Sequence, residues 1–195
     1  MTAMQIRPAT ADDCLAIAEL AQMAGDNIPG HFWAESQQPG QSLLEAGAAS
    51  AASETANFSY RNATLACIDD EVAGMLLAYR LPSAIDNTDD PAEFPDFVQP
   101  MIVLEQAVAD SYYINMLAAY PKFRGRGAGS ALLGEADDQA RNAGCDLVSI
   151  MVFAQNSGAT RLYLRHGFTE IERRPMVASA YLPAGDILLL TRPVT

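Results

Sequence analysis

A glycine-rich stretch with two arginines, residues 124–130, is the part of the sequence best suited to bind an anion. Its glycines occupy alternate positions, at Gly125, Gly127 and Gly129. Because glycine has no Cβ, the backbone N–H groups there can approach a ligand closely. A strand-like run precedes the stretch, and a helical pattern that ends at Gly144 follows it. The helix start adds unpaired N–H groups and the positive end of the helix dipole, so we predict a phosphate-binding loop.

Two common phosphate loops fit this stretch poorly. A P-loop needs a lysine after its glycines, but the only lysine of the chain, Lys122, comes before them. A dinucleotide-binding turn needs a third glycine where this chain has Ser130. It also needs an acidic residue at the end of the next strand, whereas Asp146 stands at the start of the next apolar run. What remains is a loop led by Arg124.

The arginine-led loop resembles the acetyl-CoA loop of the GCN5-related N-acetyltransferases, which has the pattern Arg/Gln-x-x-Gly-x-Gly/Ala between a strand and a helix. The preceding residues, Pro121 to Gly125, fit the usual lead-in of that family. A second block, Asn156 to Phe168, matches the family pattern Asn-x-x-Ala-x-x-Leu-Tyr-x-x-x-Gly-Phe. The specific resemblance covers about residues 111–171.

The resemblance implies that acetyl-CoA is the co-substrate and that its pantetheine arm lies beside the central strand. Leu117 and Ala119 would then offer backbone groups to the arm, and an N–H group near Leu117 would polarise the acetyl carbonyl. Asn156 would hydrogen-bond the arm. The residues expected to hold the pyrophosphate are Arg124, Gly125, Arg126, Gly127, Ala128, Gly129 and Ser130.

Tyr163 occupies the position at which this family commonly has a general acid for the departing CoA thiolate. A phenol has a pKa of about 10 and a thiol about 8.5, so complete proton transfer is uphill by roughly 2 kcal/mol. A hydrogen bond that stabilises the thiolate would serve equally well. The alternative is a tyrosine that merely packs on a helix face.

No sequence motif identifies the general base. A protonated primary amine must lose a proton before it attacks the thioester, and a carboxylate or a water held by one could accept it. Four carboxylates fall near the strands and the acidic loop that should flank the acceptor: Glu105, Asp110, Glu71 and Glu93. Tyr113 or Asn115, on the central strand, could orient a water. We take Glu105 as the candidate base, against the alternative that each carboxylate is simply solvated.

Hydrophobic periodicity predicts the elements that position these residues. Helices are expected from about residue 10 to 24, from 42 to 56, from Ser130 towards Gly144, and from Asn156 onward. Strands are expected at 5–7, 64–68, 72–80, 112–119, 147–153, 168–172 and 187–191, with an irregular stretch at 173–182. The strand, helix, strand order around the loop predicts a parallel pair. Together with the resemblance, this predicts an α/β fold with a mixed, mostly antiparallel sheet flanked by helices.

The chain of 195 residues is expected to form a single domain, 1–195. Residues 81–110 interrupt the regular pattern with four prolines and several acidic residues. We expect them to form an inserted acidic loop or a lid over the substrate, which could include a helix from about 98 to 108.

Composition narrows the class of protein. The net charge of −12 argues against nucleic-acid binding and suits a cationic acceptor. Eight of the twelve Lys and Arg residues lie between Lys122 and Arg174, in and after the proposed phosphate loop. No apolar run reaches the roughly 18 residues of a membrane span, so a soluble, cytoplasmic protein without a membrane partner is expected. Three cysteines without metal-binding spacing are expected to be core residues, and no metal is expected.

These observations predict an N-acetyltransferase that moves acetyl from acetyl-CoA to a primary amine by direct attack. Neither Cys67 nor Cys145 has a motif partner for a covalent intermediate. The acceptor is left open, and a homodimer is possible because many members of the resembled family are dimers. The alternative is a non-catalytic acyl-CoA-binding sensor or interaction module of the same fold.

Overall fold

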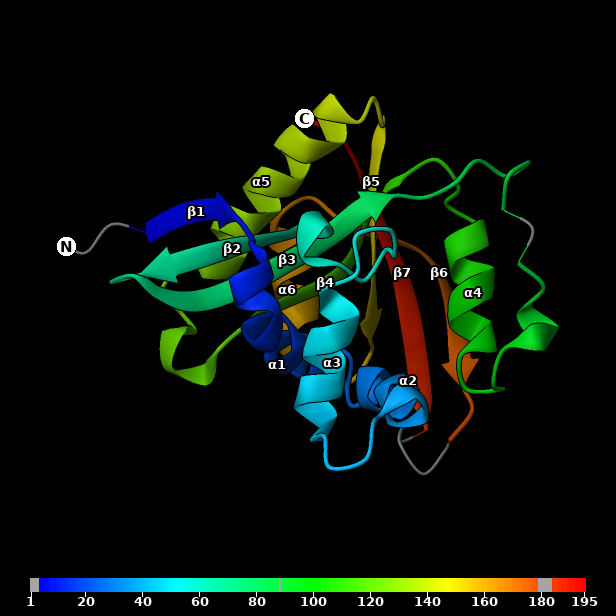
Figure 1. The fold of residues 1–195 in the computed structure, drawn as a ribbon. Coiled ribbons are helices and arrows are strands. Elements are labelled where there is room, and N and C mark those ends of the chain that lie inside the picture. Colours follow the sequence, from blue (N-terminus) through cyan, green and yellow to red (C-terminus); the bar gives the residue numbers. More distant parts are fainter. Residues whose placement is uncertain (1–3, 88, 179–183) are drawn as a thin grey trace. The chain divides into compact units, whose positions relative to one another are not determined.

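The computed structural model describes residues 4–87, 89–178 and 184–195. The described strands form a seven-stranded sheet in the order β1-β2-β3-β4-β5-β7-β6 (Figure 1). Their bounds are β1 Met4–Pro8, β2 Ala63–Ile68, β3 Glu71–Arg80, β4 Tyr112–Ala119, β5 Leu147–Phe153, β6 Thr169–Met176 and β7 Gly185–Pro193. β4 and β5 are parallel, whereas β1 with β2, β2 with β3, β5 with β7 and β6 with β7 are antiparallel. The predicted mixed, mostly antiparallel sheet is confirmed.

Helices fill most of the connections between strands. They are α1 Cys14–Ala24, α2 Ile28–Ser36, α3 Leu43–Ala51, α4 Gln99–Gln106, α5 Ala128–Asn142 and α6 Ser157–Arg165. Short 3-10 turns are η1 Ala11–Asp13, η2 Tyr60–Asn62, η3 Pro91–Glu93 and η4 Pro121–Phe123. Among the helices that the structure describes, none is long and apolar enough to cross a membrane.

The chain divides into two compact units. The first comprises Met1–Ala78 and Met116–Gly134, and the second comprises Tyr79–Asn115 and Glu135–Thr195. Strands β3 and β4 and helix α5 contribute residues to both. We describe each unit separately.

In the first unit, α1, α2 and α3 pack against one another (Figure 1). α1 follows a cap in which the Thr10 backbone N–H and hydroxyl both donate to Asp13 Oδ2, at 2.8 and 3.0 Å. Arg7 holds the same carboxylate with two bonds of 2.8 Å. A Cβ on Gly47 would lie 2.7 Å from the Trp33 ring, so α3 can approach α2 only because this residue is glycine.

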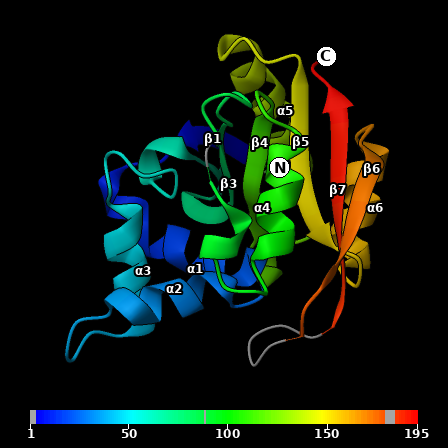
Figure 2. The same ribbon diagram turned by 90° about the vertical axis from the view of Figure 1, so that its right-hand side faces the viewer.

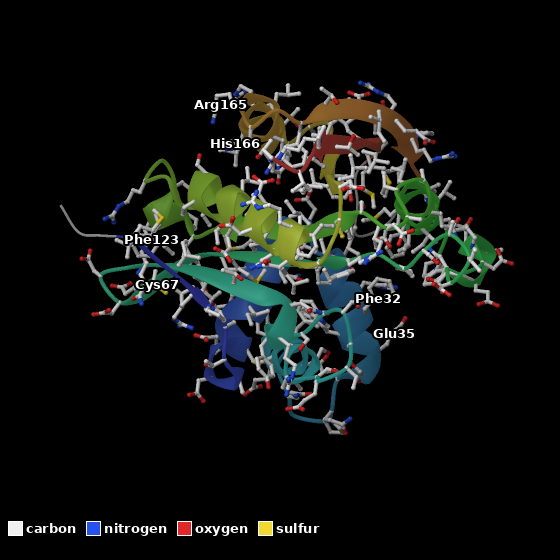
Figure 3. All side chains as sticks on the ribbon, turned by 90° about the horizontal axis from the view of Figure 1, so that it is seen from above. Phe32, Glu35, Cys67, Phe123, Arg165 and His166 are labelled. Atoms are coloured by element: carbon white, nitrogen blue, oxygen red, sulfur yellow. The ribbon has the colours of Figure 1, made fainter. Side chains whose placement is uncertain are left out.

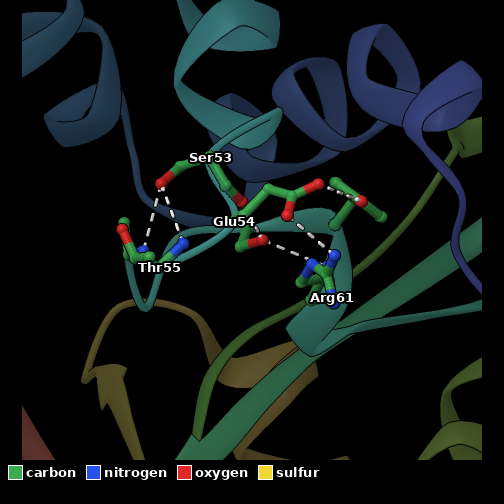
Figure 4. Close-up of polar contacts among 7 residues, drawn as sticks. Ser53, Glu54, Thr55 and Arg61 are labelled. Atoms are coloured by element: carbon green, nitrogen blue, oxygen red, sulfur yellow. Dashed lines mark hydrogen bonds and ion pairs between the residues drawn. The ribbon is translucent and has the colours of Figure 1, made fainter.

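The helix predicted from residue 42 to 56 ends earlier, at Ala51. Ser53 explains the difference, because its hydroxyl accepts the N–H groups of Thr55 at 3.3 Å and Ala56 at 3.0 Å (Figure 4). A serine that bonds nearby N–H groups in this way competes with helix formation. An ion pair of 2.9 Å between Arg61 and Glu54 then ties the loop together (Figure 4).

In the second unit, β7 lies between β5 and β6, and α4 contacts both β6 and β7 (Figure 2). Arg192 on β7 makes a buried ion pair of 2.7 Å with Asp137 on α5. The Arg192 guanidinium also lies 4.8 Å from the ring centroid of Phe168. This pair joins the helix to the strand across the core of the unit.

The prediction for the end of the chain was partly wrong. β6 continues to Met176, so residues 173–176 are strand and not irregular. Their pairing with β7 from Gly185 to Leu188 explains the extension, since Pro175 is tolerated on an edge strand. Residues 179–182 of the predicted irregular stretch lie outside the described residues.

Candidate functional site

The predicted site residues fall in both units. The first unit holds the glycine loop together with Leu117 and Ala119, and the second holds Glu105, Asn156 and Tyr163. The geometry of each group is given within its own unit.

The glycine loop exposes its backbone. Gly125 and Gly127 have φ angles of +74° and +92°, which other residues adopt only with strain. A Cβ on Gly125 would meet no atom within 4 Å, and on Gly127 it would meet only Met4 Cε at 3.9 Å. The space above both residues is therefore open to a ligand, which is how a phosphate cradle must be built.

Helix α5 begins directly after this turn. Ala128, its first residue, is 3% exposed and anchors the helix start. Ala131 donates its N–H to the Gly127 carbonyl at 3.0 Å. An α-helix has no internal carbonyl for its first N–H groups, so the first turn of α5 carries the positive end of the helix dipole.

Three cationic side chains lie in the loop or next to it, and each contacts different groups. Lys122 forms an ion pair with Glu71. Arg124 donates from Nε to the Ala119 carbonyl at 3.2 Å, so this carbonyl already has one donor. Arg126 lies over the ring of Phe123, with Cζ 5.5 Å from the centroid. Within the described part of the chain, neither arginine of the loop makes an ion pair.

The end of the central strand β4 leads into the loop. Leu117 and Ala119 are half-buried there. β3 approaches closely, because a Cβ on Gly74 would lie 2.6 Å from the Ala118 carbonyl oxygen. The Tyr120 N–H donates to the Ala73 carbonyl at 2.9 Å. This pairing fixes the point at which the chain leaves the sheet for the loop.

The parallel pairing of β4 with β5 is short. Within the second unit the registered pairs run from Tyr112 with Val148 to Ile114 with Ile150. Asn115 has no registered partner on β5 among the described residues, although β5 continues to Phe153. Both strands thus extend beyond their mutual hydrogen bonds.

Tyr163 is buried on α6, with only 4% of the residue exposed. Its ring packs on Phe168 at a centroid distance of 5.9 Å. Burial raises the pKa of the Tyr163 phenol above its usual value. The phenol therefore stays protonated and can donate a hydrogen bond, while complete transfer of its proton becomes more costly.

Asn156 caps helix α6. Its Oδ1 accepts the N–H of Ala159 at 3.1 Å, so the side chain has a structural role that the motif did not reveal. The carboxamide has a second end, and only its Nδ2 group is left to reach a ligand.

The environment of Glu105 differs from that of the other candidate bases. It lies on α4, where burial raises the pKa of its carboxyl to about 7, although a hydrogen bond donated by the Tyr113 hydroxyl opposes the shift and the nearby Asp89 adds to it. Asp110, in contrast, forms an exposed ion pair of 3.0 Å with Arg80. Two other candidates also differ from Glu105, since Glu71 pairs with Lys122 and Glu93 is exposed in η3.

A second tyrosine completes the group around Glu105. The Tyr79 hydroxyl accepts a hydrogen bond of 2.7 Å from Asn115 Nδ2. The rings of Tyr79 and Tyr113 meet edge to face, with centroids 5.9 Å apart. Tyr113 and Asn115 were expected from the sequence to orient a water, whereas Tyr79 was missed. Its place near the end of a strand that precedes an acidic loop was the only available signal.

Comparison with known proteins identifies the family. The model of the acetyltransferase (GNAT) family matches residues 28–168. The chain belongs to this family. GNAT membership agrees with both sequence blocks and with the fold.

Two curated relatives are similar over shorter stretches. One is an uncharacterized N-acetyltransferase of Methanocaldococcus jannaschii, 44% identical over 59 residues, which are 30% of this chain and 26% of that protein. The other is N-alpha-acetyltransferase 30 of Saccharomyces cerevisiae, 34% identical over 83 residues, which are 43% of this chain and 46% of that protein. The matches therefore span less than half of either relative.

Solved GNAT structures share the fold at low sequence identity. A structure described as an acetyltransferase has a TM-score of 0.67 at 21% identity, covering 98% of this chain and 100% of that one. A polyamine N-acetyltransferase of Drosophila melanogaster has a TM-score of 0.67 at 13% identity, with the same coverage. A putative acetyltransferase of Salmonella typhimurium, solved with acetyl-CoA, has a TM-score of 0.61 at 17% identity and covers 99% and 95% of the two chains.

Proposed function

We propose that this GNAT protein transfers acetyl from acetyl-CoA to a primary amine by direct attack. The observation that carries the enzyme assignment is Glu105, a half-buried carboxyl with a pKa of about 7 and a hydrogen bond from Tyr113. A group that accepts and releases protons near neutral pH suits general base catalysis, and a module that only binds acyl-CoA does not need one.

The glycine loop is proposed to hold the pyrophosphate of acetyl-CoA. The open space at Gly125 and Gly127 fits a group that must approach the backbone closely. Backbone N–H groups from Gly127 to Ser130 would bind it, with Arg124 nearby. Leu117, Ala119 and the Asn156 Nδ2 group would position the pantetheine arm.

Glu105 would act as the general base, and Tyr163 would donate a hydrogen bond to the leaving group. Glu105 takes a proton from the ammonium group of the acceptor, directly or through a water, and the freed nitrogen lone pair attacks the acetyl carbon. A backbone N–H near Leu117 stabilises the oxyanion that forms on the carbonyl oxygen. The C–S bond breaks, the new amide nitrogen releases its remaining extra proton to solvent, and the leaving thiolate is stabilised by a hydrogen bond from the Tyr163 phenol before solvent protonates it.

The pKa of Glu105 bears on the choice of acceptor. Proton transfer from an α-ammonium group of pKa about 8 to a base of pKa about 7 is uphill by roughly 1.4 kcal/mol. Transfer from a lysine-like ammonium group of pKa about 10.4 is uphill by roughly 4.6 kcal/mol. An α-amine, as the name of the yeast relative indicates for that protein, is therefore the first acceptor to test, and a polyamine, named for the Drosophila structure, is the second.

Calorimetry with acetyl-CoA and a thiol-release assay at pH 8 test the proposal in one preparation. The acceptors are short peptides with free α-amines, polyamines and free amino acids. Binding with acceptor-dependent thiol release would support the transferase. Binding without release from any acceptor would favour the sensor, and no binding would show that the loop has been misinterpreted.

A further inference from the structure

We propose that Arg126, supported by the ring of Phe123, binds the 3′-phosphate of the CoA ribose and selects CoA over its 3′-dephospho form. This inference depends on the proposed binding of acetyl-CoA. It assigns a phosphate monoester site beside the pyrophosphate site, with its own side-chain ligand.

The support under Arg126 is rigid. Phe123, labelled in Figure 3, is 6% exposed. It packs with Ile68 and Ala73 in an apolar cluster. Met4 and Tyr120 complete the cluster from the side. A ring held on several sides cannot turn away, so the guanidinium above it gains a fixed platform. Stacking on an aromatic ring is a typical way to hold an arginine ready for an anion.

Two cationic side chains, Lys122 and Arg126, lie against the ring of Phe123. Of these two, only Lys122 forms an ion pair among the described residues. Lys122 Nζ is 4.8 Å from the centroid and is paired with Glu71. Arg126 Cζ is 5.5 Å from the centroid, and the side chain makes no ion pair within the described residues. Its fork of N–H donors matches a phosphate group.

The position of Arg126 favours the monoester over the pyrophosphate. Its side chain folds back over residue 123, whereas the helix start that would hold the pyrophosphate begins at Ala128. The backbone N–H groups already serve the pyrophosphate in the proposal. A phosphate monoester carries about 1.5 to 2 negative charges at pH 7 and presents three acceptor oxygens. With the pyrophosphate held by the backbone, the monoester is the charged CoA group left for a separate guanidinium.

The test compares two ligands that differ only in this phosphate, acetyl-CoA and acetyl-3′-dephospho-CoA. Calorimetry gives the Kd of each for the unmodified protein and for Arg126→Ala. A charged hydrogen-bonded contact should make the unmodified protein bind acetyl-CoA about 10- to 100-fold more tightly. Arg126→Ala should remove most of this preference by weakening acetyl-CoA binding alone, and the preference should shrink as salt is added.

Three further variants sharpen the test. Arg165→Ala removes an equal charge from an exposed position on α6 and should leave the preference intact (Figure 3). Arg126→Lys keeps the charge without the fork and should keep only part of it. Phe123→Leu removes the platform while the site stays apolar, and should also reduce the preference if thermal unfolding shows that the variant is folded.

The outcomes separate this inference from the proposed function. Equal affinity of the unmodified protein for both ligands would overturn it, as would an Arg126→Ala variant that weakens both by the same factor. Either result would leave acetyl-CoA binding established. If the unmodified protein bound neither ligand, the proposed function would fail together with the inference.

Discussion

At the scale of single residues, the carboxyl of Glu105 shows how burial creates a proton acceptor. Its pKa of about 7 results first from loss of solvent, and the hydrogen bond from Tyr113 pulls in the opposite direction. Tyr113→Phe removes that bond, so the pKa should rise further. We expect the acidic limb of the kcat/KM profile to move to higher pH. The measurement is the pH profile of kcat/KM for the acceptor, taken at acceptor concentrations below KM with saturating acetyl-CoA.

Tyr112 provides a matched control on the other face of β4. Its hydroxyl donates to Gln139 at 2.8 Å, and as the neighbour of Tyr113 in the strand its side chain lies on the opposite face of the sheet. Tyr112→Phe should leave the acidic limb where it is. A profile that did not move in Tyr113→Phe would show that Glu105 is not the group that titrates in catalysis.

The same shift predicts a gain of stability when Glu105 is neutralised. Because its pKa is raised from 4.5 to about 7, its stabilising contribution is complete below pH 4.5 and is lost as the pH rises through 7. At pH 8 the folded protein therefore holds a poorly solvated charge. Glu105→Gln should raise the free energy of unfolding by about 1 to 3 kcal/mol at pH 8 and change it little at pH 4.

Urea unfolding at both pH values measures this difference. The proposed role of Glu105 requires that turnover falls in the same variant. A variant that is neither more stable at pH 8 nor slower would remove the basis for choosing this carboxyl.

Tyr163 is expected to act on the rate and not on binding. The raised pKa of its phenol favours a hydrogen bond to the thiolate over complete transfer of the proton. Tyr163→Phe should lower kcat by about 10- to 100-fold, the range for a hydrogen bond to a charged group. Its Kd for acetyl-CoA should stay nearly constant in calorimetry. An unchanged rate on a true acceptor would mean that the ring only packs on Phe168.

At the scale of elements, the turn into α5 depends on one backbone conformation. Gly127 has a φ of +92°, and a β-branched residue there would be strained and would project into the open space. Gly127→Val should abolish acetyl-CoA binding in calorimetry. Gly134 lies inside α5, where a Cβ would meet nothing within 4 Å.

Gly134→Ala is therefore the control from the same helix. It should leave binding intact and stabilise the protein by up to about 1 kcal/mol, since alanine favours helix more than glycine does. Unchanged affinity of Gly127→Val would show that the loop does not hold the phosphates.

The elements that the sequence predicted well are those whose signal is local. Alternating glycines and apolar runs such as Leu147 to Phe153 act within a few residues, and the structure has the corresponding loop and strand. The early end of α3 was missed because a side-chain bond from Ser53 decides it. The extension of β6 was missed because it depends on pairing with β7, a distant segment.

In the candidate site, too, local motifs could be recognised in the sequence, whereas contacts between distant segments could not. The glycine loop, Asn156 and Tyr163 were predicted because they belong to spaced motifs, and their roles in binding and catalysis stay predictions. Glu105 could be named but not distinguished, since its burial depends on how α4 packs. Tyr79 was missed because its hydrogen bond to Asn115 joins residues 36 positions apart.

At the scale of the whole molecule, charge is distributed unevenly along the chain. Residues 1–120 contain 17 acidic and 3 basic residues, and residues 121–195 contain 7 and 9, which together give the net charge of −12. This asymmetry would attract a cationic acceptor and confines most basic groups to the later part of the chain. The acidic segment 81–110 also supplies Glu105 through α4, so its predicted role as a lid, which stays a prediction, would bring the base with it.

Asn156, the cap of α6, combines two functions that depend on different atoms of its side chain. One end of Asn156 completes the helix, and the other is proposed to hold the ligand. Aspartate or serine could supply the first function, because both accept the same backbone N–H, but neither offers the amide donor. Aspartate or serine could therefore replace Asn156 in the course of evolution without loss of the fold. Such a protein would keep the acetyltransferase fold while it bound acetyl-CoA more weakly.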